Sequence, residues 1–354
     1  HETEGADGTV DPLTPLATVF THMGGEHSGY LRPRRGAENQ IPQLETKRIP
    51  LQPEDYQCAW EGLQMSLAEL QPEESSVIPA LLTALERWTS DFPDEVRAGS
   101  ETDLSLYDRR RTAAAFGSCL SEYLLDREDS TFQEAALRKE KTFLLYTAGF
   151  SGIQKFIYTV ATQGAQKSLR SRSFFLEMLM EHYADEVLQA CGLSRVNLIY
   201  SGGGHCYLLL PHTQKALSAV QAVNDRTNDW LIDQFGTALF VAHGWSACSA
   251  NDLTNTPAEK APYKTVFSRV SEAVSRHKLS RYRAEQIRRL NRERAGQDGR
   301  ECKVCGSTDV LRQDRCAWCA RFEALSLKIQ DEARVVYVVS RDAEKADLPP
   351  PGDL

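Results

Sequence analysis

The sequence predicts an α+β protein built from several segments, and three observations lead to that class. Apolar residues at helical spacing fill much of residues 1–138. Apolar runs and turn signals then follow a β-α-β-β-α-β order over residues 139–254. A basic segment of helical pattern, residues 255–330, carries two Cys-x-x-Cys pairs, and a β-branched run in residues 331–354 predicts the first strand of another sheet.

Composition limits the class of protein. With 354 residues, 41% of them hydrophobic, the chain can bury two or three cores, and no apolar run approaches the length of a membrane span. A net charge of −8 and the lack of a recognisable signal peptide favour a soluble, cytoplasmic protein with no membrane partner. Because the sequence starts at His1 rather than at methionine, we expect a fragment, or separate segments numbered continuously.

The N-terminal region, residues 1–138, is predicted to be mostly helical. Residues 24–51 show no regular pattern and are predicted to form a loop. Helical patterns lie near Tyr56–Leu70, Ser76–Phe92 and Arg109–Leu125.

The β-α-β-β-α-β segment begins with a short apolar strand, Phe143–Ala148, that stops at Gly149. Ser151-Gly152 then opens a helix whose apolar face includes Ile153 and Phe156. A charged turn is predicted at residues 167–172, and a second helical pattern follows it as far as Gly192.

The second half of this segment is a predicted hairpin followed by a helix and a strand. Two β-rich runs, Val196–Tyr200 and Cys206–Leu210, flank three consecutive glycines. An amphipathic helix from about Thr213 to Phe235 and a strand at Ala238–Ala242 complete the order. That order is the one of a ferredoxin-like fold.

Two glycine-bearing turns are predicted at the same end of neighbouring antiparallel strands. Glycines let a backbone approach a phosphate closely, and the start of a helix offers N–H groups to an anion. Alternatively, the three consecutive glycines only form a loose hairpin, since glycine is common in such turns. The residues predicted to bind a nucleotide are Ser151, Gly152, Gly202, Gly203, Gly204 and His205.

Four cysteines form two Cys-x-x-Cys pairs that are ten residues apart, namely Cys302, Cys305, Cys316 and Cys319. This spacing lets four thiolates surround one ion, and a site with no open position holds a structural Zn²⁺ rather than a catalytic one. A pair of disulfides is the competing interpretation, but an acidic chain without a signal peptide favours a reducing compartment. The other five cysteines lie in apolar contexts and are predicted to be small core residues.

The segment from Lys260 to Arg300 holds twelve Lys or Arg residues and four acidic ones in an otherwise acidic chain. Arginines on exposed helix faces suit a phosphate backbone, whereas the alternative is a merely solvated face. Aromatic residues for base stacking are sparse in this segment, so sequence-specific reading of bases is not indicated. The residues predicted to contact RNA or phosphate, here and after the first helix of the sheet domain, are Lys167, Arg170, Arg172, Arg281, Arg288 and Arg289.

Three motifs in order carry a resemblance to a known family: Phe-Ser-Gly-Ile-Gln-Lys-Phe-Ile-Tyr at 150–158, Gly-Ala-Gln-Lys-Ser-Leu-Arg-Ser-Arg-Ser-Phe at 164–174, and Ser-Gly-Gly-Gly at 201–204. They resemble the first Palm domain of the large subunit of type III-A, Csm-type CRISPR effector complexes, the Cas-ten family. The resemblance continues in looser form from about Asp11 to the C-terminal end. It implies that residues 139–254 are the first Palm, followed by the zinc-bearing insertion and the start of a second Palm, and that the protein is prokaryotic.

The resemblance also implies a function. The family belongs to RNA-guided interference complexes, binds CRISPR RNA and target RNA beside other Csm-type subunits, and makes cyclic oligoadenylates from ATP with Mg²⁺ or Mn²⁺. Its metal-binding residues are a Gly-Gly-Asp-Asp turn in the second Palm, whereas the hairpin here continues into His205 and Cys206. The full-length protein is therefore expected to be the synthase, and this chain to hold ATP without performing the chemistry alone.

Cleavage of single-stranded DNA is a second activity of the family, carried out by an N-terminal HD domain. That chemistry needs adjacent His and Asp ligands, and no His-Asp pair occurs in this sequence. A later family segment, Ser-Leu-Tyr-Asp-His, appears here with Arg109 in place of the histidine, and arginine cannot ligate a metal. Asp108 is therefore predicted to be a structural carboxylate, residues 1–138 to be a remnant of the HD region with its connector, and DNA to be at most an additional partner.

Two other functions remain open at this stage. A stand-alone cyclase of the diguanylate or adenylate type shares the strand order but needs carboxylates near the positions of Ser151 and His205. A zinc-ribbon RNA-binding protein without enzymatic activity would explain the basic helices but not the glycine turns. ATP binding separates this last function from the other two.

Overall fold

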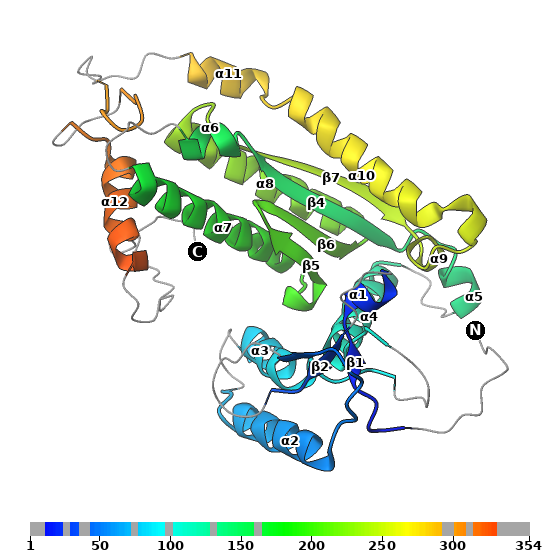
Figure 1. The fold of residues 1–354 in the computed structure, drawn as a ribbon. Coiled ribbons are helices and arrows are strands. Elements are labelled where there is room, and N and C mark those ends of the chain that lie inside the picture. The colour runs from blue at the N-terminus through cyan, green and yellow to red at the C-terminus, as the bar shows by residue number, and fades with distance from the viewer. Residues whose placement is uncertain are drawn as a thin grey trace. The chain divides into compact units, whose positions relative to one another are not determined.

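The computed structural model describes residues 11–23, 29–34, 43–71, 77–95, 102–127, 133–158, 165–291, 301–308 and 314–330 (Figure 1). The chain divides into two compact units between Gly117 and Ser118, earlier than the boundary predicted at residue 138. The predicted start of a second Palm, residues 331–354, lies outside the described residues. Among the helices of the described part, none is both long and apolar enough to cross a membrane.

The first unit combines helices with a small sheet. Strands β1 (Leu16–Ala17), β2 (Tyr30–Arg32) and β3 (Gln43–Glu45) pair antiparallel in that order. These strands fall partly in the stretch predicted to be a loop, because two or three residues are too few to show alternation. The helices of this unit are α1 (Val19–His22), α2 (Pro53–Ala68), α3 (Val77–Thr89) and α4 (Leu106–Leu125), whose second half belongs to the other unit.

Asp108 has the structural role that the sequence predicts. Its carboxylate Oδ2 accepts a hydrogen bond from Ser105 Oγ at 2.7 Å, and Ser105 Oγ accepts from the Asp108 backbone N–H at 3.0 Å. This reciprocal pair gives a backbone N–H group in the first turn of α4 a hydrogen-bond acceptor, as Ser and Asp commonly do at a helix start.

The second unit is built around a four-stranded sheet with the strand order β5-β6-β4-β7, in which every neighbouring pair is antiparallel. Its connectivity is the split β-α-β-β-α-β arrangement of a ferredoxin-like fold, as predicted. The elements of the motif are β4 (Phe143–Ser151), α6 (Ile153–Tyr158), α7 (Ala165–Ala190), β5 (Leu198–Gly202), β6 (His205–Pro211), α8 (Gln214–Phe235) and β7 (Phe240–Cys248). The other elements are α5 (Glu134–Leu137), α9 (Ala250–Leu253), α10 (Pro262–Leu279), α11 (Ala284–Leu290), α12 (Ala317–Gln330) and two short 3-10 turns, Arg195–Asn197 and Ala258–Lys260.

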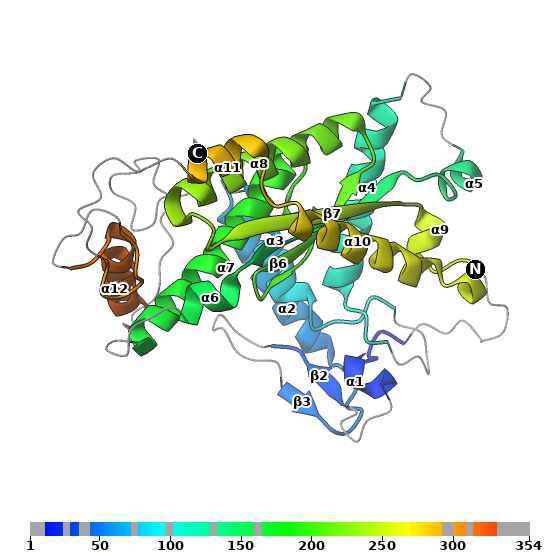
Figure 2. The ribbon, with the colours of Figure 1, turned by 90° about the horizontal axis from the view of Figure 1, so that it is seen from above.

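Helices cover both faces of this sheet (Figures 1 and 2). Tyr146 on β4 and Tyr183 on α7 are fully buried between the sheet and the α7/α8 layer, and their hydroxyls hydrogen bond at 2.6 Å. Helix α10 packs on the other face, against β7 and β4. A Cβ atom at Gly244 would lie 2.6 Å from the Val274 backbone N, so glycine lets α10 approach β7 closely. Helix α10, which carries part of the basic segment, therefore forms one layer of the sheet domain itself.

One sequence prediction about the helices is wrong. Residues 167–172 form no turn, because α7 already begins at Ala165. The buried face of α7 starts with Ser171 and Arg172 and continues into Phe175 and Leu176. Polar residues thus occupy inward positions at the start of a helix whose apolar pattern becomes visible only one turn later.

Candidate nucleotide site and metal centre

The two glycine turns lie side by side at one end of the sheet. Strands β4 and β6 are paired so that Gly149 is opposite His205, and the Phe150 N–H donates a 3.0 Å hydrogen bond to the Gly204 carbonyl. The end of β4 and the β5–β6 hairpin are therefore joined directly, as the strand order requires. This adjacency was predicted from the sequence, and the strand register confirms it.

Two of the glycines are required by different features of the backbone. Gly152 has a φ of +97°, and a Cβ atom there would lie 2.1 Å from the Ala238 carbonyl oxygen. Gly203 has a φ of +60° at the tip of the hairpin, and no described atom lies within 4 Å of the position its Cβ would take. A side chain at position 152 would therefore clash with the backbone, whereas a side chain at position 203 would meet no described atom.

Residues predicted to bind a nucleotide share one face of the sheet. Because strand residues alternate between faces, Ser151, Gly202 and His205 lie on the same side, opposite the face that α7 and α8 cover. The His205 ring lies over Gly149, where a Cβ atom would be 2.4 Å from its Cδ2, and its Nδ1 is 3.0 Å from the Gly203 carbonyl. If Nδ1 carries the proton, this contact orients the imidazole at the hairpin tip.

Arg281 brings one of the predicted phosphate contacts to this face. It follows α10, and its Nη2 donates a 2.9 Å hydrogen bond to Ser151 Oγ. A guanidinium beside a hydroxyl at a glycine-rich turn is a suitable arrangement for a phosphate oxygen. The structure thus places together two residues that the sequence suggested for separate reasons.

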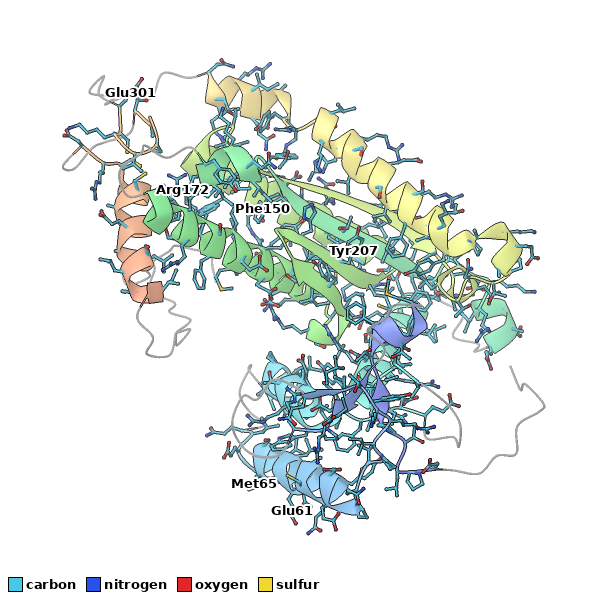
Figure 3. The ribbon with its side chains drawn as sticks, viewed as in Figure 1. Glu61, Met65, Phe150, Arg172, Tyr207 and Glu301 are labelled. Atoms are coloured by element: carbon cyan, nitrogen blue, oxygen red, sulfur yellow. The ribbon has the colours of Figure 1, made fainter. Side chains whose placement is uncertain are left out.

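An aromatic row on the same face was missed by the sequence analysis. Tyr200 and Tyr207 have ring centroids 6.5 Å apart, Tyr207 is 6.0 Å from Phe267 of α10, and Phe267 is 4.7 Å from Tyr263. Figure 3 labels Tyr207 on β6. The alternation that places Gly202 and His205 on this face also places Tyr200 and Tyr207 there, so strand parity could have found both.

The other predicted RNA contacts have different surroundings. Arg170 and Arg288 are exposed, and neither has a partner among the described residues. Lys167 lies in the first turn of α7, and its side chain is not among those described. Arg172 is only 3% exposed, which removes it from any surface contact with RNA.

Arg289 is committed to contacts within the protein. Its guanidinium pairs with Asp229 at 3.1 Å and with Asp233 at 3.4 Å, both on α8. Arg283 also pairs with Asp229, so these contacts attach α11 to α8. Acidic residues of α8 therefore neutralise part of the basic segment, and local charge counted along the sequence overstates the charge offered to a partner.

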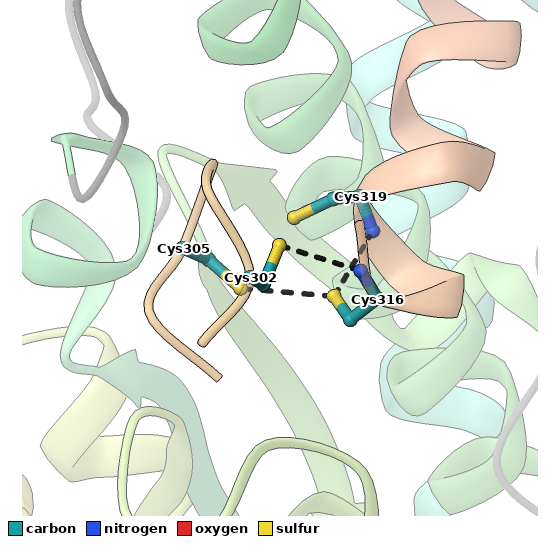
Figure 4. Close-up of side chains that lie close together, drawn as sticks. All are labelled: Cys302, Cys305, Cys316 and Cys319. Atoms are coloured by element: carbon teal, nitrogen blue, oxygen red, sulfur yellow. Dashed lines mark hydrogen bonds between the residues drawn. The ribbon is translucent and has the colours of Figure 1, made fainter. Parts of the chain in front are cut away.

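The four cysteines of the predicted metal centre come together in the structure (Figure 4). Their sulfur atoms all lie within 4.8 Å of one another. Cys302, Cys316 and Cys319 are buried, and Cys305 is half-buried. The sulfur atoms of Cys305 and Cys316 lie 3.6 Å apart, which is far longer than a disulfide bond, and all nine cysteines are free.

Backbone hydrogen bonds shape the loop that carries Cys302 and Cys305. The Gly306 N–H donates to the Cys302 carbonyl at 2.8 Å, and Gly306 has a φ of +72°. The Cys316 N–H donates to Cys302 Sγ at 3.3 Å. Hydrogen bonds from Cys316 and Cys319 lower the pKa of the Cys305 thiol below its ordinary value.

An aromatic cluster attaches the metal centre to the core of the second unit. Trp318 and Phe322 of α12 lie 5.3 and 5.4 Å from the Phe175 ring of α7, and Trp318 is 4.7 Å from Phe235 of α8. A cavity of about 750 Å³ lies beside this cluster and is lined by Lys155, Tyr282 and Ser307, among others. The residues of the glycine hairpin do not line it.

Four of the remaining cysteines are small core residues, as predicted: Cys119, Cys191, Cys206 and Cys248. Burial raises the pKa of Cys206 to about 12 and that of Cys191 to about 11, so these thiols stay protonated and unreactive near neutral pH. Cys58 differs, because it is only half-buried.

Comparisons with known proteins agree on one family. A family model described as Csm1 subunit domain B matches residues 142–293. A relative from Mycobacterium tuberculosis, a CRISPR system single-strand-specific deoxyribonuclease Cas10/Csm1 of subtype III-A, is 39% identical over 365 residues, which cover 97% of this chain and 45% of the relative. The chain thus spans less than half the length of this relative.

Solved structures show the same fold. A Csm1–Csm4 cassette in complex with one ATP has a TM-score of 0.63 and 25% identity, covering 78% of this chain and 36% of the solved chain. A Csm1–Csm4 cassette in complex with cA3 also has a TM-score of 0.63 and 25% identity, covering 76% of this chain and 35% of the solved one.

Proposed function

Because this chain belongs to the Csm1 family of type III-A CRISPR large subunits, we propose that it supplies one half of an ATP site at which cyclic oligoadenylates are made. The observation that carries this proposal is the end of the sheet where Ser151, the Gly202–Gly204 hairpin and Arg281 lie together. Solved relatives with ATP or cA3 bound support the choice of ligand.

The roles follow from the chemistry of each group. Backbone N–H groups of the hairpin approach the triphosphate, the Arg281 guanidinium and the Ser151 hydroxyl bind its oxygens, and His205 borders the same position. Neither turn offers a carboxylate, so the Mg²⁺ or Mn²⁺ that neutralises the triphosphate is held by another part of the complete protein. This absence also argues against a stand-alone cyclase.

We further assign a structural Zn²⁺ to Cys302, Cys305, Cys316 and Cys319, because four thiolates leave no open coordination position. Crystallised relatives are bound to Csm4, and we propose that this chain assembles with the corresponding subunit and with CRISPR RNA and target RNA in a prokaryotic cytoplasm. No deoxyribonuclease role is assigned to this chain, because its sequence lacks a His-Asp pair.

The hairpin's role is tested with Gly203→Leu. We expect ATP affinity to fall about 10-fold or more, since a side chain at the tip blocks close approach of the phosphates. Gly236→Leu is the matched control, because Gly236 also has a φ of +60° with no described atom within 4 Å of the Cβ position, so backbone strain is shared and only the site differs. Equal ATP affinity of the two variants in isothermal titration contradicts this role.

The RNA contact is tested with Arg288→Glu. Arg288 is exposed, and we expect RNA affinity to fall about 3- to 10-fold and the salt dependence of binding to flatten by roughly one counterion. Glu285→Gln, on the same helix, leaves every arginine in place and serves as the control. Affinities measured between 50 and 300 mM salt decide the matter, and an unchanged slope would leave Arg288 as a solvated side chain.

A further inference from the structure

Arg172 is a buried cation that has no carboxylate partner in the described part of the chain. Its side chain is 3% exposed, and no described acidic group forms an ion pair with it. Its Nη1 donates to the Phe156 carbonyl at 2.7 Å and its Nε to Ser168 Oγ at 3.2 Å. Neutral acceptors satisfy these hydrogen bonds but do not balance a full positive charge in an apolar environment.

Among the described residues, the acceptor of Arg172 that can become an anion is a sulfur of the metal centre. Arg172 Nη2 lies 3.5 Å from Cys319 Sγ, and Cys319 is itself buried. Arg172 comes from the second turn of α7 and Cys319 from the first turn of α12, so this contact joins two elements that are far apart in the sequence. Figure 3 labels Arg172 near the start of α7, the helix that packs against α12.

Aromatic rings hold the guanidinium in this position. Its Cζ lies 4.9 Å from the Phe156 ring centroid and 5.2 Å from the Phe322 ring centroid, both within the range of cation–π contacts. A planar guanidinium fits between two rings and still directs its edge at an acceptor, which a lysine ammonium does not do as well. The position is therefore specific to arginine.

We propose that Arg172 is the counter-charge of the four-cysteine metal centre. Four thiolates around a divalent ion carry a net charge of −2, and a guanidinium that donates N–H to Cys319 Sγ lowers the cost of burying that charge. The inference rests on the metal proposed above and adds to it, because it names a group of the protein that would balance the charge of the bound centre.

The same residue links the metal centre to the nucleotide site. Phe156, whose carbonyl accepts from Arg172, belongs to α6, the helix that begins directly after Gly152. Arg172 is thus a positioning residue that fixes α6 on one side and the α12 sulfur on the other.

The test uses Co²⁺ as a spectroscopic substitute for the metal in Arg172→Met, Arg172→Lys and the control Arg170→Met, whose arginine is exposed on the same helix. We expect Arg172→Met to bind Co²⁺ 10- to 100-fold more weakly in competition with a chelator. Its sulfur-to-cobalt charge-transfer band should move to longer wavelength, because a thiolate without its cation gives up an electron more easily. Arg172→Lys should recover part of both changes, and Arg170→Met should resemble the unmodified chain.

The outcomes separate two failures. If the unmodified chain binds no Co²⁺, both the metal and the role of Arg172 are wrong. If it binds Co²⁺ and Arg172→Met does so with an unchanged band and an affinity within 2-fold, the metal remains and only the counter-charge is refuted. If Arg172→Met does not fold, the Arg172→Lys variant provides the test. A shift of its charge-transfer band to longer wavelength supports the counter-charge, whereas an unchanged band indicates that Arg172 only fills space.

Discussion

Gly152→Ala is expected to destabilise the second unit by about 2–5 kcal/mol. The new Cβ would lie 2.1 Å from the Ala238 carbonyl oxygen, a backbone atom that cannot move without shifting the start of β7. The positive φ of +97° adds a conformational cost of about 1–2 kcal/mol. Thermal unfolding followed by circular dichroism should show a midpoint lowered by roughly 5–15 °C.

Gly236→Ala separates the two contributions in that experiment. Gly236 also has a positive φ, but no described atom lies within 4 Å of the Cβ position, so only the conformational cost applies. Its expected effect is about 1–2 kcal/mol. If both variants unfold at the same temperature, the contact between the β4 turn and the start of β7 is not as close as described.

Sequence reasoning located the sheet and its turns because local signals coincide there. The glycines between β5 and β6 mark a hairpin, the apolar runs on both sides have strand length, and the residues of the tip follow from alternation. The cysteine pairs are equally local, since the spacing of Cys302, Cys305, Cys316 and Cys319 alone fixes which sulfurs can meet.

Long-range partners could not be predicted in the same way. The sequence marks Arg172 and Arg289 as basic, but it does not reveal that one reaches Cys319 and the other reaches acids of α8. Both contacts depend on how helices pack on the sheet, which the period of apolar residues along one helix leaves open. The contact between Arg281 and Ser151 likewise depends on how α10 packs against the sheet.

Replacing Cys302 and Cys305 together by serine is expected to abolish metal binding and to release the segment from residue 301 to 330. Structural zinc sites contribute folding free energy directly, by about 10–16 kcal/mol in isolated zinc-finger peptides. Here the aromatic contacts of Trp318 and Phe322 retain part of the packing, so the loss should be smaller and local. Limited trypsin digestion with mass spectrometry should show new cleavage in this segment while the sheet stays protected.

Cys58→Ser is the control, because Cys58 is half-buried in the other unit and lies outside the metal centre. A chelator added to the unmodified chain should reproduce the new cleavage, whereas a reductant alone should not, which distinguishes bound metal from disulfides. Since Arg172 donates both to Cys319 Sγ and to the Phe156 carbonyl, metal removal should also increase hydrogen exchange in α6. Unchanged protection of α6 after complete metal loss would show that the metal centre stabilises α12 alone.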